Sequence, residues 1–387
     1  MNTKRSFISM PKIICVVGAR PNFMKIAPIM KVLKRNSSLI HTMLVHTGQH
    51  YDLAMNHRFF EQLEIPNPDV NLEVGSSTHA VQTAEIMRRF EPVLDREQPD
   101  AILVVGDVNS TIACALVAAK KQIAVIHVEA GLRSFDRTMP EEINRVLTDQ
   151  ISDLLFTTER KAQNNLMREG IDESRIMFVG NVMIDTLRAS VEKAIRARVT
   201  IAAAERDPDL FLNSSNGFGL LTLHRPANVD DSAILMRLLT VLRGISDELP
   251  LIFPVHPRTS TAIEKHGLND ILETPGILLL PPQGYLELLG LMAKARLVLT
   301  DSGGIQEETT ALGIPCITMR ESTERPITVE EGTNTIVGSD PDRIRTAFRE
   351  ILETGGKAGQ IPVYWDGHAA ERIVDHIFMW LRSLGRM

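Results

Sequence analysis

The feature that most constrains the fold is a repeated alternation of short apolar runs with longer amphipathic segments. The runs are continuously apolar, which is typical of parallel strands buried on both faces. In the first half, strands are predicted at Ile13–Val17, Met43–Val45, Ala101–Val105, Ile123–Val128 and Leu154–Thr157. A second series begins near Gly219, with strands predicted at Leu220–Leu223, Leu251–Val255, Ile277–Leu280, Leu297–Thr300, Cys316–Met319 and Thr335–Val337.

The segments between these strands have helical character. Ser110–Lys121 begins with Ser/Thr caps and ends in lysines. Glu141–Asp153 follows Pro140 and places Ile143, Val146, Leu147 and Ile151 on one face. The segment 189–217 is polar and reads as a helix plus a junction, and a last helix is expected over 367–384. The sequence therefore predicts an α/β chain with two doubly wound, Rossmann-like domains.

Composition excludes several classes of protein. The 387 residues carry a net charge of -6, which argues against nucleic acid as the main partner. The three cysteines are Cys15, Cys114 and Cys316, and each lies in an apolar run, so buried thiols are expected rather than disulfides. The N-terminal MNTKRSFISMPK has no long apolar core, and no longer stretch is apolar enough to span a membrane.

Charged residues follow several of the first-half strands. Ligands of doubly wound sheets bind beyond the carboxyl ends of the strands, and with two domains the expected site is the cleft between them. Arg20 and Lys25 follow the first strand and suit phosphate, although a solvated turn would also explain them. Asp107 and Glu129 each follow a strand, and Glu141 opens a helix. Asp107 is also explained as a turn former, and Glu141 as compensation of the helix dipole.

The acids Asp107, Glu129 and Glu141 come from neighbouring connections between strands and helices. Asp107 and Glu129 are therefore expected to face one space. Carboxylates crowded into a dry cleft raise one another's pKa, which produces general acids and bases at neutral pH. The sequence thus predicts proton-transfer chemistry at this edge of the first sheet.

Histidines and arginines follow two strands of the second half. One strand ends in His224-Arg225, and the next is followed by His256 and Arg258. A histidine at a strand end serves as an acid, a base or a phosphate partner, but it is also a common structural residue.

The most specific stretch is TDSGGIQEETTALGIP, residues 300–315. A strand leads here into a glycine-rich helix start, where backbone N–H groups and the helix dipole favour a diphosphate. The residues expected at this anion site are Ser302, Gly303 and Gly304. Glu308, one turn further, is positioned for a ribose diol, and the turn containing Gln283 and Tyr285 for a base. The alternative explanation is a tight turn between strand and helix without a ligand, and such a turn would need fewer of these residues.

Two other kinds of site are disfavoured. No GxGxxG occurs, so a nicotinamide cofactor is not expected. The spacing of His41, His46, His50 and His57 matches no usual zinc pattern, so no metal site is expected.

A set of motifs resembles one known family. GARPNFMK, HTGQHYD, GDVNST, HVEAGLRS, PEEINR, LHRPANVD, VHPRT, DSGGIQEE and TERP occur here in the order seen in the non-hydrolysing UDP-N-acetylglucosamine 2-epimerases. The resemblance covers nearly the whole chain. It implies a GT-B fold with Rossmann-like domains over 1–188 and 189–366, the second binding UDP, and residues 367–387 packing back on the first. It also implies a cytoplasmic homodimer that uses no cofactor or metal.

The resemblance further implies interconversion of UDP-GlcNAc and UDP-ManNAc, through loss of UDP to a 2-acetamidoglucal and its re-addition. Asp107, Glu129, Glu141 and His224 match the family's catalytic residues. The positions expected to bind substrate are Arg20, Lys25, Arg225, His256, Arg258, Gln283, Tyr285, Ser302, Gly303, Gly304, Glu308 and Arg325. Gln49 and His50 match a loop at which family members bind an allosteric substrate molecule. The resemblance leaves open which carboxylate is the acid and which the base.

Several rivals share these features. They are a hydrolysing epimerase that releases ManNAc and UDP, a 2-epimerase of a modified UDP-sugar, a GT-B glycosyltransferase that needs an acceptor, and a nucleotide-sugar sensor without turnover.

Overall fold

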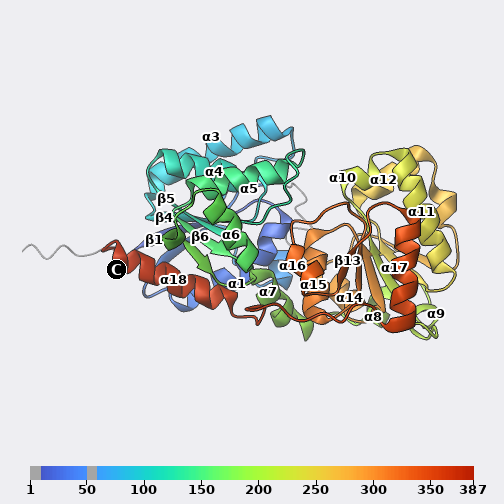
Figure 1. Cartoon of the computed structure of the whole chain (residues 1–387). Coiled ribbons are helices and arrows are strands. Elements are labelled where there is room, and N and C mark those ends of the chain that lie inside the picture. Colours follow the sequence, from blue (N-terminus) through green and yellow to red (C-terminus); the bar gives the residue numbers. More distant parts are fainter. Residues whose placement is uncertain (1–9, 50–58) are drawn as a thin grey trace, which may run out of the picture. The chain divides into compact units, whose positions relative to one another are not determined.

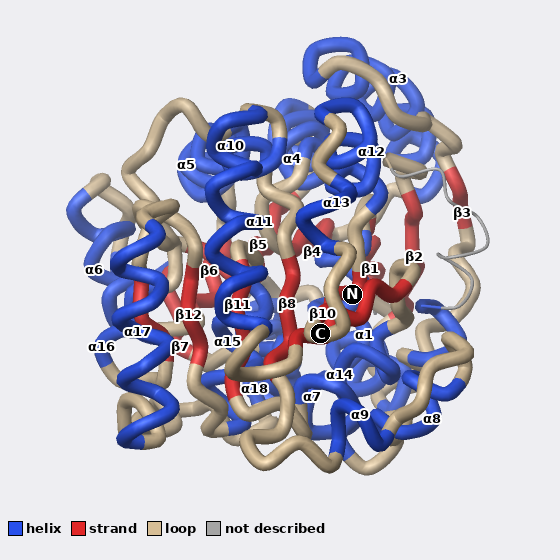
Figure 2. The backbone as a smooth tube through the Cα atoms, turned by 90° about the vertical axis from the view of Figure 1, so that its right-hand side faces the viewer, coloured by secondary structure: helices blue, strands red, loops and turns tan. Residues whose placement is uncertain are grey.

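The computed structural model describes residues 10–49 and 59–387, which divide into two compact units (Figure 1). Unit 1 comprises Met1–Thr186 and Val363–Met387, and unit 2 comprises Leu187–Pro362. No helix within the described ranges has the length and apolar composition needed to cross a membrane. Figure 2 marks the helices, strands and loops of the described residues by colour.

Unit 1 contains a seven-stranded sheet in the order β3-β2-β1-β4-β5-β6-β7, with every neighbouring pair parallel. Its strands are β1 (Lys12–Val17), β2 (His41–His46), β3 (Val70–Asn71), β4 (Ala101–Val105), β5 (Ala124–Ala130), β6 (Leu154–Thr157) and β7 (Ile176–Phe178). Its helices are α1 (Arg20–Arg35), α3 (His79–Glu97), α4 (Asn109–Lys120), α5 (Pro140–Ile151), α6 (Arg160–Arg168), the short 3₁₀ turn η1 (Glu173–Arg175), α7 (Val182–Val191), which ends in unit 2, and α18 (Ala369–Ser383).

Unit 2 contains a six-stranded parallel sheet in the order β10-β9-β8-β11-β12-β13. Its strands are β8 (Gly219–Thr222), β9 (Leu251–Pro254), β10 (Ile277–Leu280), β11 (Leu297–Thr300), β12 (Cys316–Thr318) and β13 (Asn334–Ile336). Its helices are α8 (Ala197–Ala202), α9 (Asp209–Leu212), α10 (Pro226–Val229), α11 (Ser232–Ser246), α12 (Pro257–His266), α13 (Asn269–Leu272), α14 (Tyr285–Met292), α15 (Gly303–Leu312), α16 (Pro326–Glu330) and α17 (Pro341–Thr354). Successive residues of one strand, such as Leu220 and Leu221, belong to two different core clusters.

The predicted fold class is confirmed, since each unit is a doubly wound α/β sheet. All the predicted strands are present, with ends that differ by a residue or two. The sequence did not reveal β3 (Val70–Asn71) or β7 (Ile176–Phe178), because both are very short strands at the edges of the first sheet. A short edge strand buries little apolar surface and so leaves little hydrophobic pattern.

The orientation of α5 differs from the sequence prediction. Ile143 and Leu147, on its expected core face, are 44% and 49% exposed. The buried face is polar instead and consists of Glu142, Asn144, Arg145, Thr148 and Asp149. Burying charges is costly unless they are paired, and Asn144, Arg145 and Asp149 find partners at the ends of β4 and β5, described below.

The last helix, α18, belongs to unit 1, where it packs beside α1 (Figure 1). Asp185 accepts hydrogen bonds at its N-terminus from the backbone N–H groups of Ala369 (3.1 Å) and Ala370 (2.7 Å). Burial raises the pKa of Asp185 to about 6, although these hydrogen bonds oppose the rise. Asp185 therefore fastens the returning helix to the chain that precedes unit 2.

At about pH 4, below the folded pKa of Asp185, the cost of burying its charge does not enter. There we expect Asp185→Ala to lower the free energy of unfolding by roughly 1–2 kcal/mol, the usual cost of a lost N-terminal cap. Asp375→Ala, on the exposed side of the same helix, is the control, and its effect should stay within about 0.5 kcal/mol. Chemical denaturation measures both. Equal effects of the two substitutions would contradict the capping role.

Candidate active site

The turn after β1 is tied to the neighbouring strand β4. Asn22 Oδ1 accepts from the backbone N–H of Gly18 (3.0 Å), and Asn22 Nδ2 donates to the carbonyl of Val105 (2.9 Å). Arg20 begins α1, and its guanidinium lies over the ring of Phe59, 5.6 Å from the centroid. Arg20 therefore lies at the carboxyl end of the central strands of unit 1.

A buried ion pair stands beside this turn. Lys25 Nζ lies 2.7 Å from Glu129 Oε1, and the two side chains are 5% and 1% exposed. Glu129 has a φ of +74°, and the pairing of β5 with β6 shifts register between Val128 and Ala130. A left-handed backbone at a residue with a side chain costs about 1–3 kcal/mol, so its surroundings must hold it there. Such strained positions cluster at functional sites.

Asp107 follows β4 directly after Gly106 and is held from α5. Arg145 Nε donates to Asp107 Oδ2 (2.9 Å), and Asn144 Nδ2 donates to the carbonyl of Asp107 (2.8 Å). Gly106 has a φ of +67°, and a Cβ added there would lie 2.7 Å from Lys25 Nζ. Lys25 thus contacts Glu129 and also covers the residue before Asp107.

The electrostatics of this group differ from the sequence expectation. Two crowded carboxylates that repel one another were expected. Instead, Glu129 is paired with Lys25 and Asp107 with Arg145. Each cation offsets the repulsion between neighbouring carboxylates.

Of the two acids that open α5, Glu142 is the one that organises the preceding loop. It is buried and accepts hydrogen bonds from the backbone N–H groups of Ser134 (3.0 Å) and Phe135 (2.9 Å). It also pairs with Arg145. Glu141, the predicted catalytic residue, is half-buried in the same first turn.

Of the proposed allosteric pair, the structure describes only Gln49. Its side-chain oxygen accepts from the backbone N–H (3.1 Å) and the hydroxyl (2.7 Å) of Ser110. His50 lies outside the described residues, as does His57. In the described part of the chain, no three His, Cys, Asp or Glu side chains gather as a metal site requires.

In unit 2, Asp301 joins the end of β11 to the end of β8. It is fully buried and accepts from the backbone N–H groups of His224 (3.0 Å) and Arg225 (2.8 Å) and from Asn228 Nδ2 (3.2 Å). It also lies 3.0 Å from His224 Nδ1. Burial alone would raise the pKa of Asp301, but hydrogen bonding from His224 and Arg225 lowers it. The imidazole of His224, one-third exposed, is thereby fixed at the strand end.

The predicted anion site is the N-terminus of α15. Ser302 is its N-cap residue, and the backbone N–H of Ser302 donates to Thr300 Oγ1 (2.9 Å). Gly303 and Gly304 are the first two helical residues. A Cβ added to Gly303 would lie 2.7 Å from Glu324 Oε1. The chain therefore passes close to this helix start on the segment that leads to α16.

Arginines gather next to the same helix start. Glu324 pairs with Arg320 (2.9 Å) and Arg325 (2.9 Å), and Arg225 lies 3.9 Å from it. Arg325 also pairs with Glu307 (3.0 Å). Three guanidinium groups beside a helix N-terminus provide a local positive field on a chain whose net charge is negative.

Glu308 is a buried acid, and one of its two carboxyl oxygens lacks a hydrogen-bond partner among the described residues. Burial raises its pKa to about 7, with a hydrogen bond to Tyr285 opposing and the charge of Glu307 adding to the rise. Its Oε1 has no hydrogen-bond partner among the described residues. A buried carboxyl oxygen without a donor is suited to accept from a ligand hydroxyl.

Three other predicted residues make local contacts. His256 Nδ1 accepts from the backbone N–H of Arg258 (3.2 Å) and so caps α12. Arg258 itself pairs with Asp230 (2.5 Å) on the surface. Gln283 Nε2 donates to the carbonyl of Pro281 (2.7 Å), within the turn before α14.

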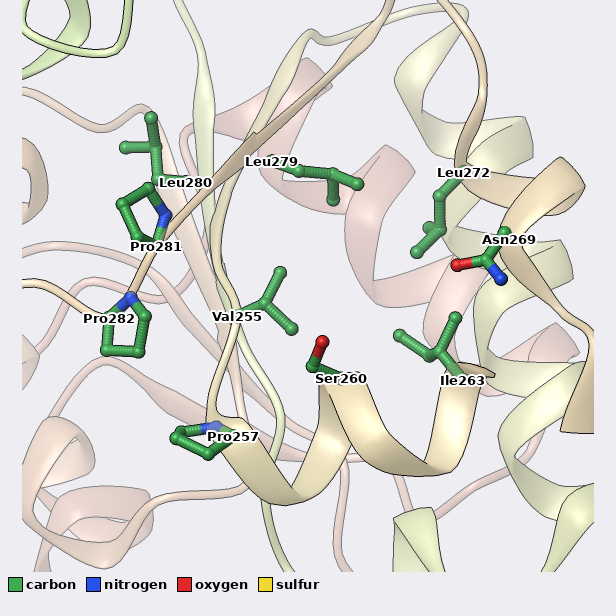
Figure 3. Close-up of a pocket in the computed structure, with 10 residues that line it drawn as sticks. All are labelled: Val255, Pro257, Ser260, Ile263, Asn269, Leu272, Leu279, Leu280, Pro281 and Pro282. Carbon is green, nitrogen blue, oxygen red and sulfur yellow. The ribbon is translucent and has the colours of Figure 1, made fainter. Parts of the chain in front are cut away.

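A cavity of about 400 Å³ borders that turn. Figure 3 shows Ser260, Ile263, Leu272 and Leu279 pointing toward a common space. The remaining lining residues are Val255, Pro257, Asn269, Leu280, Pro281 and Pro282. Its lining among the described residues is uncharged, which suits uncharged groups rather than a diphosphate.

Sequence reasoning missed the groups on α5 that hold the site. Glu142, Arg145 and Asp149 recur at the helical spacings of three, four and seven, so they share a face. That polar periodicity was a usable signal. The competing apolar periodicity of Ile143 and Leu147 obscured it.

The raised pKa of Glu308 predicts a pH effect on stability. The folded pKa of about 7 exceeds the ordinary 4.5, so the stabilisation is complete below pH 4.5 and is lost as the pH rises through 7. Glu308→Gln should remove this loss, so that the variant gains up to roughly 3 kcal/mol relative to the wild type between pH 5 and pH 8. Denaturant unfolding at several pH values measures this.

Glu248→Gln, at an exposed acid of unit 2, is the matched control and should follow the wild type across the pH range. If the Glu308→Gln curve also runs parallel to the wild type, the proposed environment of Glu308 is wrong.

Comparison with known proteins places the chain in a family. The family model described as UDP-N-acetylglucosamine 2-epimerase matches residues 31–378. The UDP-N-acetylglucosamine 2-epimerase of Methanocaldococcus jannaschii is 43% identical over 94% of this chain and 98% of its own length. The UDP-2,3-diacetamido-2,3-dideoxy-D-glucuronate 2-epimerase of Pseudomonas aeruginosa is 41% identical, over 95% of this chain and 99% of its own.

A solved structure is similar as well. The crystal structure of the M. jannaschii enzyme in complex with UDP-GlcNAc and UDP superposes with a TM-score of 0.84 at 42% identity, covering 95% of this chain and 99% of that one. This likeness supports the GT-B type of fold. The chain is therefore an isomerase that belongs to the UDP-N-acetylglucosamine 2-epimerase family.

Proposed function

We propose that this protein interconverts UDP-GlcNAc and UDP-ManNAc without net hydrolysis. The observation that carries the proposal is the buried Lys25–Glu129 pair, presented on a strained β-bulge beside Asp107. A plain structural ion pair would not require a left-handed backbone at the acid itself. The names of the relatives support a 2-epimerase that acts on UDP-N-acetylglucosamine.

Unit 2 supplies the nucleotide-binding groups in this proposal. The diphosphate binds at Ser302, Gly303 and Gly304, where helix N–H groups and the arginines beside Glu324 favour negative charge. Glu308, with its unsatisfied oxygen, accepts from a ribose hydroxyl.

Unit 1 supplies the groups for proton transfer. One carboxylate takes the proton from C2 as the C1–O bond breaks, which yields a 2-acetamidoglucal and UDP. A second acid then returns a proton to the other face of C2 while a UDP oxygen bonds to C1, so atoms and charge balance. We assign the proton transfers to Asp107, Glu129 and Glu141. His224, held by Asp301, is assigned to interact with the leaving diphosphate.

A modified UDP-sugar is the second candidate substrate. It is favoured by the 41% identity to an epimerase whose name gives a diacetamido glucuronate sugar. The chemistry at C2 would be the same, and only the groups around the ring would differ.

Incubation of the purified protein with UDP-GlcNAc alone should yield UDP-ManNAc. In D₂O the product should carry deuterium at C2, since the base exchanges its proton with solvent. In H₂¹⁸O the sugar should stay unlabelled, since UDP rather than water returns to C1. Proton NMR and mass spectrometry measure these outcomes.

Free ManNAc with UDP would identify a hydrolysing enzyme instead. No change with UDP-GlcNAc but turnover of a diacetamido uronate would identify the second candidate. Glu129→Gln should lower turnover by about 10²-fold or more, whereas Glu173→Gln, at an exposed acid of unit 1, should leave it unchanged.

The fit of Lys25 against Gly106 gives a further prediction. Gly106→Ala should lower turnover about tenfold or more, because the added Cβ displaces Lys25 Nζ from Glu129. Gly170→Ala is the matched control. Gly170 also has positive φ, at +85°, but an added Cβ there meets no described atom within 4 Å.

Both substitutions carry a similar backbone penalty, about 1–2 kcal/mol. Thermal denaturation should show a larger loss of stability for Gly106→Ala, because that variant also disturbs the buried pair. Equal turnover in the two variants would contradict the role given to Lys25.

A further inference from the structure

His127 lies on β5, two residues before Glu129, and its side chain is fully buried. Its ring contacts two oxygen atoms. Nδ1 is 2.7 Å from Asp149 Oδ1 on α5, and Nε2 is 2.9 Å from the carbonyl oxygen of Gly106. A backbone carbonyl only accepts hydrogen bonds, so Nε2 must carry a proton.

The contact with Asp149 determines whether the other ring nitrogen, Nδ1, carries a proton. Asp149 Oδ2 lies 2.7 Å from the guanidinium of Arg133 and accepts from the backbone N–H of Gly131 (3.1 Å). An acid that receives these two donors is stabilised in its ionised form. Asp149 Oδ1 is then also an acceptor, so Nδ1 donates to it. Both ring nitrogens donate, which only the imidazolium can do.

The charges around this imidazolium balance. Asp149 contacts the ring, and beyond it Arg133 pairs with Glu169 at 2.6 Å. Two cations, His127 and Arg133, therefore alternate with two anions, Asp149 and Glu169. Alternation of this kind offsets the desolvation of buried charge.

The backbone groups that His127 and Asp149 bind lie next to the proposed catalytic acids Asp107 and Glu129. Gly106 directly precedes Asp107, and its N–H donates to the carbonyl of Val128 (3.0 Å) while its carbonyl meets His127. Both polar backbone groups of Gly106 are thus bound to β5. Glu129 stands between His127 on that strand and Gly131 just after it, and both of these residues bind Asp149.

We propose that His127 is a positioning residue that, as a buried imidazolium, clamps the end of β4 to the bulge of β5 and so fixes Asp107 relative to Glu129. It does not touch the substrate. The role of His127 in turnover rests on the proposed epimerisation. Its double protonation is independent of that proposed function.

The protonation state is tested on the unmodified protein. The probe is the enzyme labelled with ¹⁵N at histidine, with the His127 signals identified by their loss in His127→Gln. We expect both His127 ring nitrogens to carry a proton in the folded enzyme under the conditions of the turnover assay, because both contact acceptor oxygens. A His127 nitrogen without a proton under those conditions would overturn the proposal.

A matched pair of variants tests the positioning. The amide nitrogen of His127→Gln reaches the place of Nε2 and keeps the donor to Gly106, whereas that of His127→Asn reaches the place of Nδ1 and loses it. We expect kcat to stay within about threefold of the wild type for Gln and to fall about 10- to 100-fold for Asn, the scale of a misplacement near 1 Å. KM for UDP-GlcNAc should change less than about threefold in both.

Equal kcat in the two variants, a smaller loss for Asn than for Gln, or a loss confined to KM would overturn the positioning role. If neither the variants nor the wild type turns over UDP-GlcNAc, the proposed function fails. The NMR measurement then still decides the protonation of His127.

Discussion

The buried contact between Lys25 and Glu129 is the interaction on which unit 1 depends most. Transfer of the two charged groups out of water costs several kcal/mol for each, and only a short contact between them offsets this cost. The 2.7 Å separation provides that geometry. Several features of the surrounding chain follow from this demand: Gly106 leaves room for the ammonium, the β-bulge turns Glu129 toward it, and Asn22 fixes the start of the helix that carries Lys25.

The two units present charge in different ways. Unit 1 pairs two of its proposed acids, Glu129 and Asp107, with the buried cations Lys25 and Arg145, so both carboxylates are held in place. Unit 2 relies on backbone N–H groups and on arginines shared among Glu307 and Glu324. The first arrangement suits proton transfer, which is sensitive to small displacements. The second suits a diphosphate, whose charge is spread over many oxygens.

Much of the fold could be predicted because parallel strands buried on both faces leave continuous apolar runs. Asp107 and Glu129 could be singled out for the same reason, since Glu129 directly follows such a run and Asp107 follows one after a single glycine. Individual contacts could not be predicted. That Asp107 would meet Arg145 depends on which face α5 turns inward, and the helix carries both an apolar and a polar periodicity. Packing on β4 and β5 decided between them, and no local pattern encodes that choice. The bulge at Glu129 is likewise invisible in HVEAG, because a register shift is a property of two strands together.

Unit 1 is assembled from two stretches of chain that are separated by the whole of unit 2. A ribosome emits the chain from its N-terminus, so the seven-stranded sheet emerges long before α18 does. Until then, the surface of α1 that α18 covers is bare, and the buried Asp185 lacks the N–H groups of Ala369 and Ala370. Domains generally fold as units during synthesis, and exposed apolar surface invites aggregation. The nascent first unit is therefore an incomplete folding intermediate until unit 2 has been translated. During this interval it exposes the most apolar surface to which a chaperone could bind.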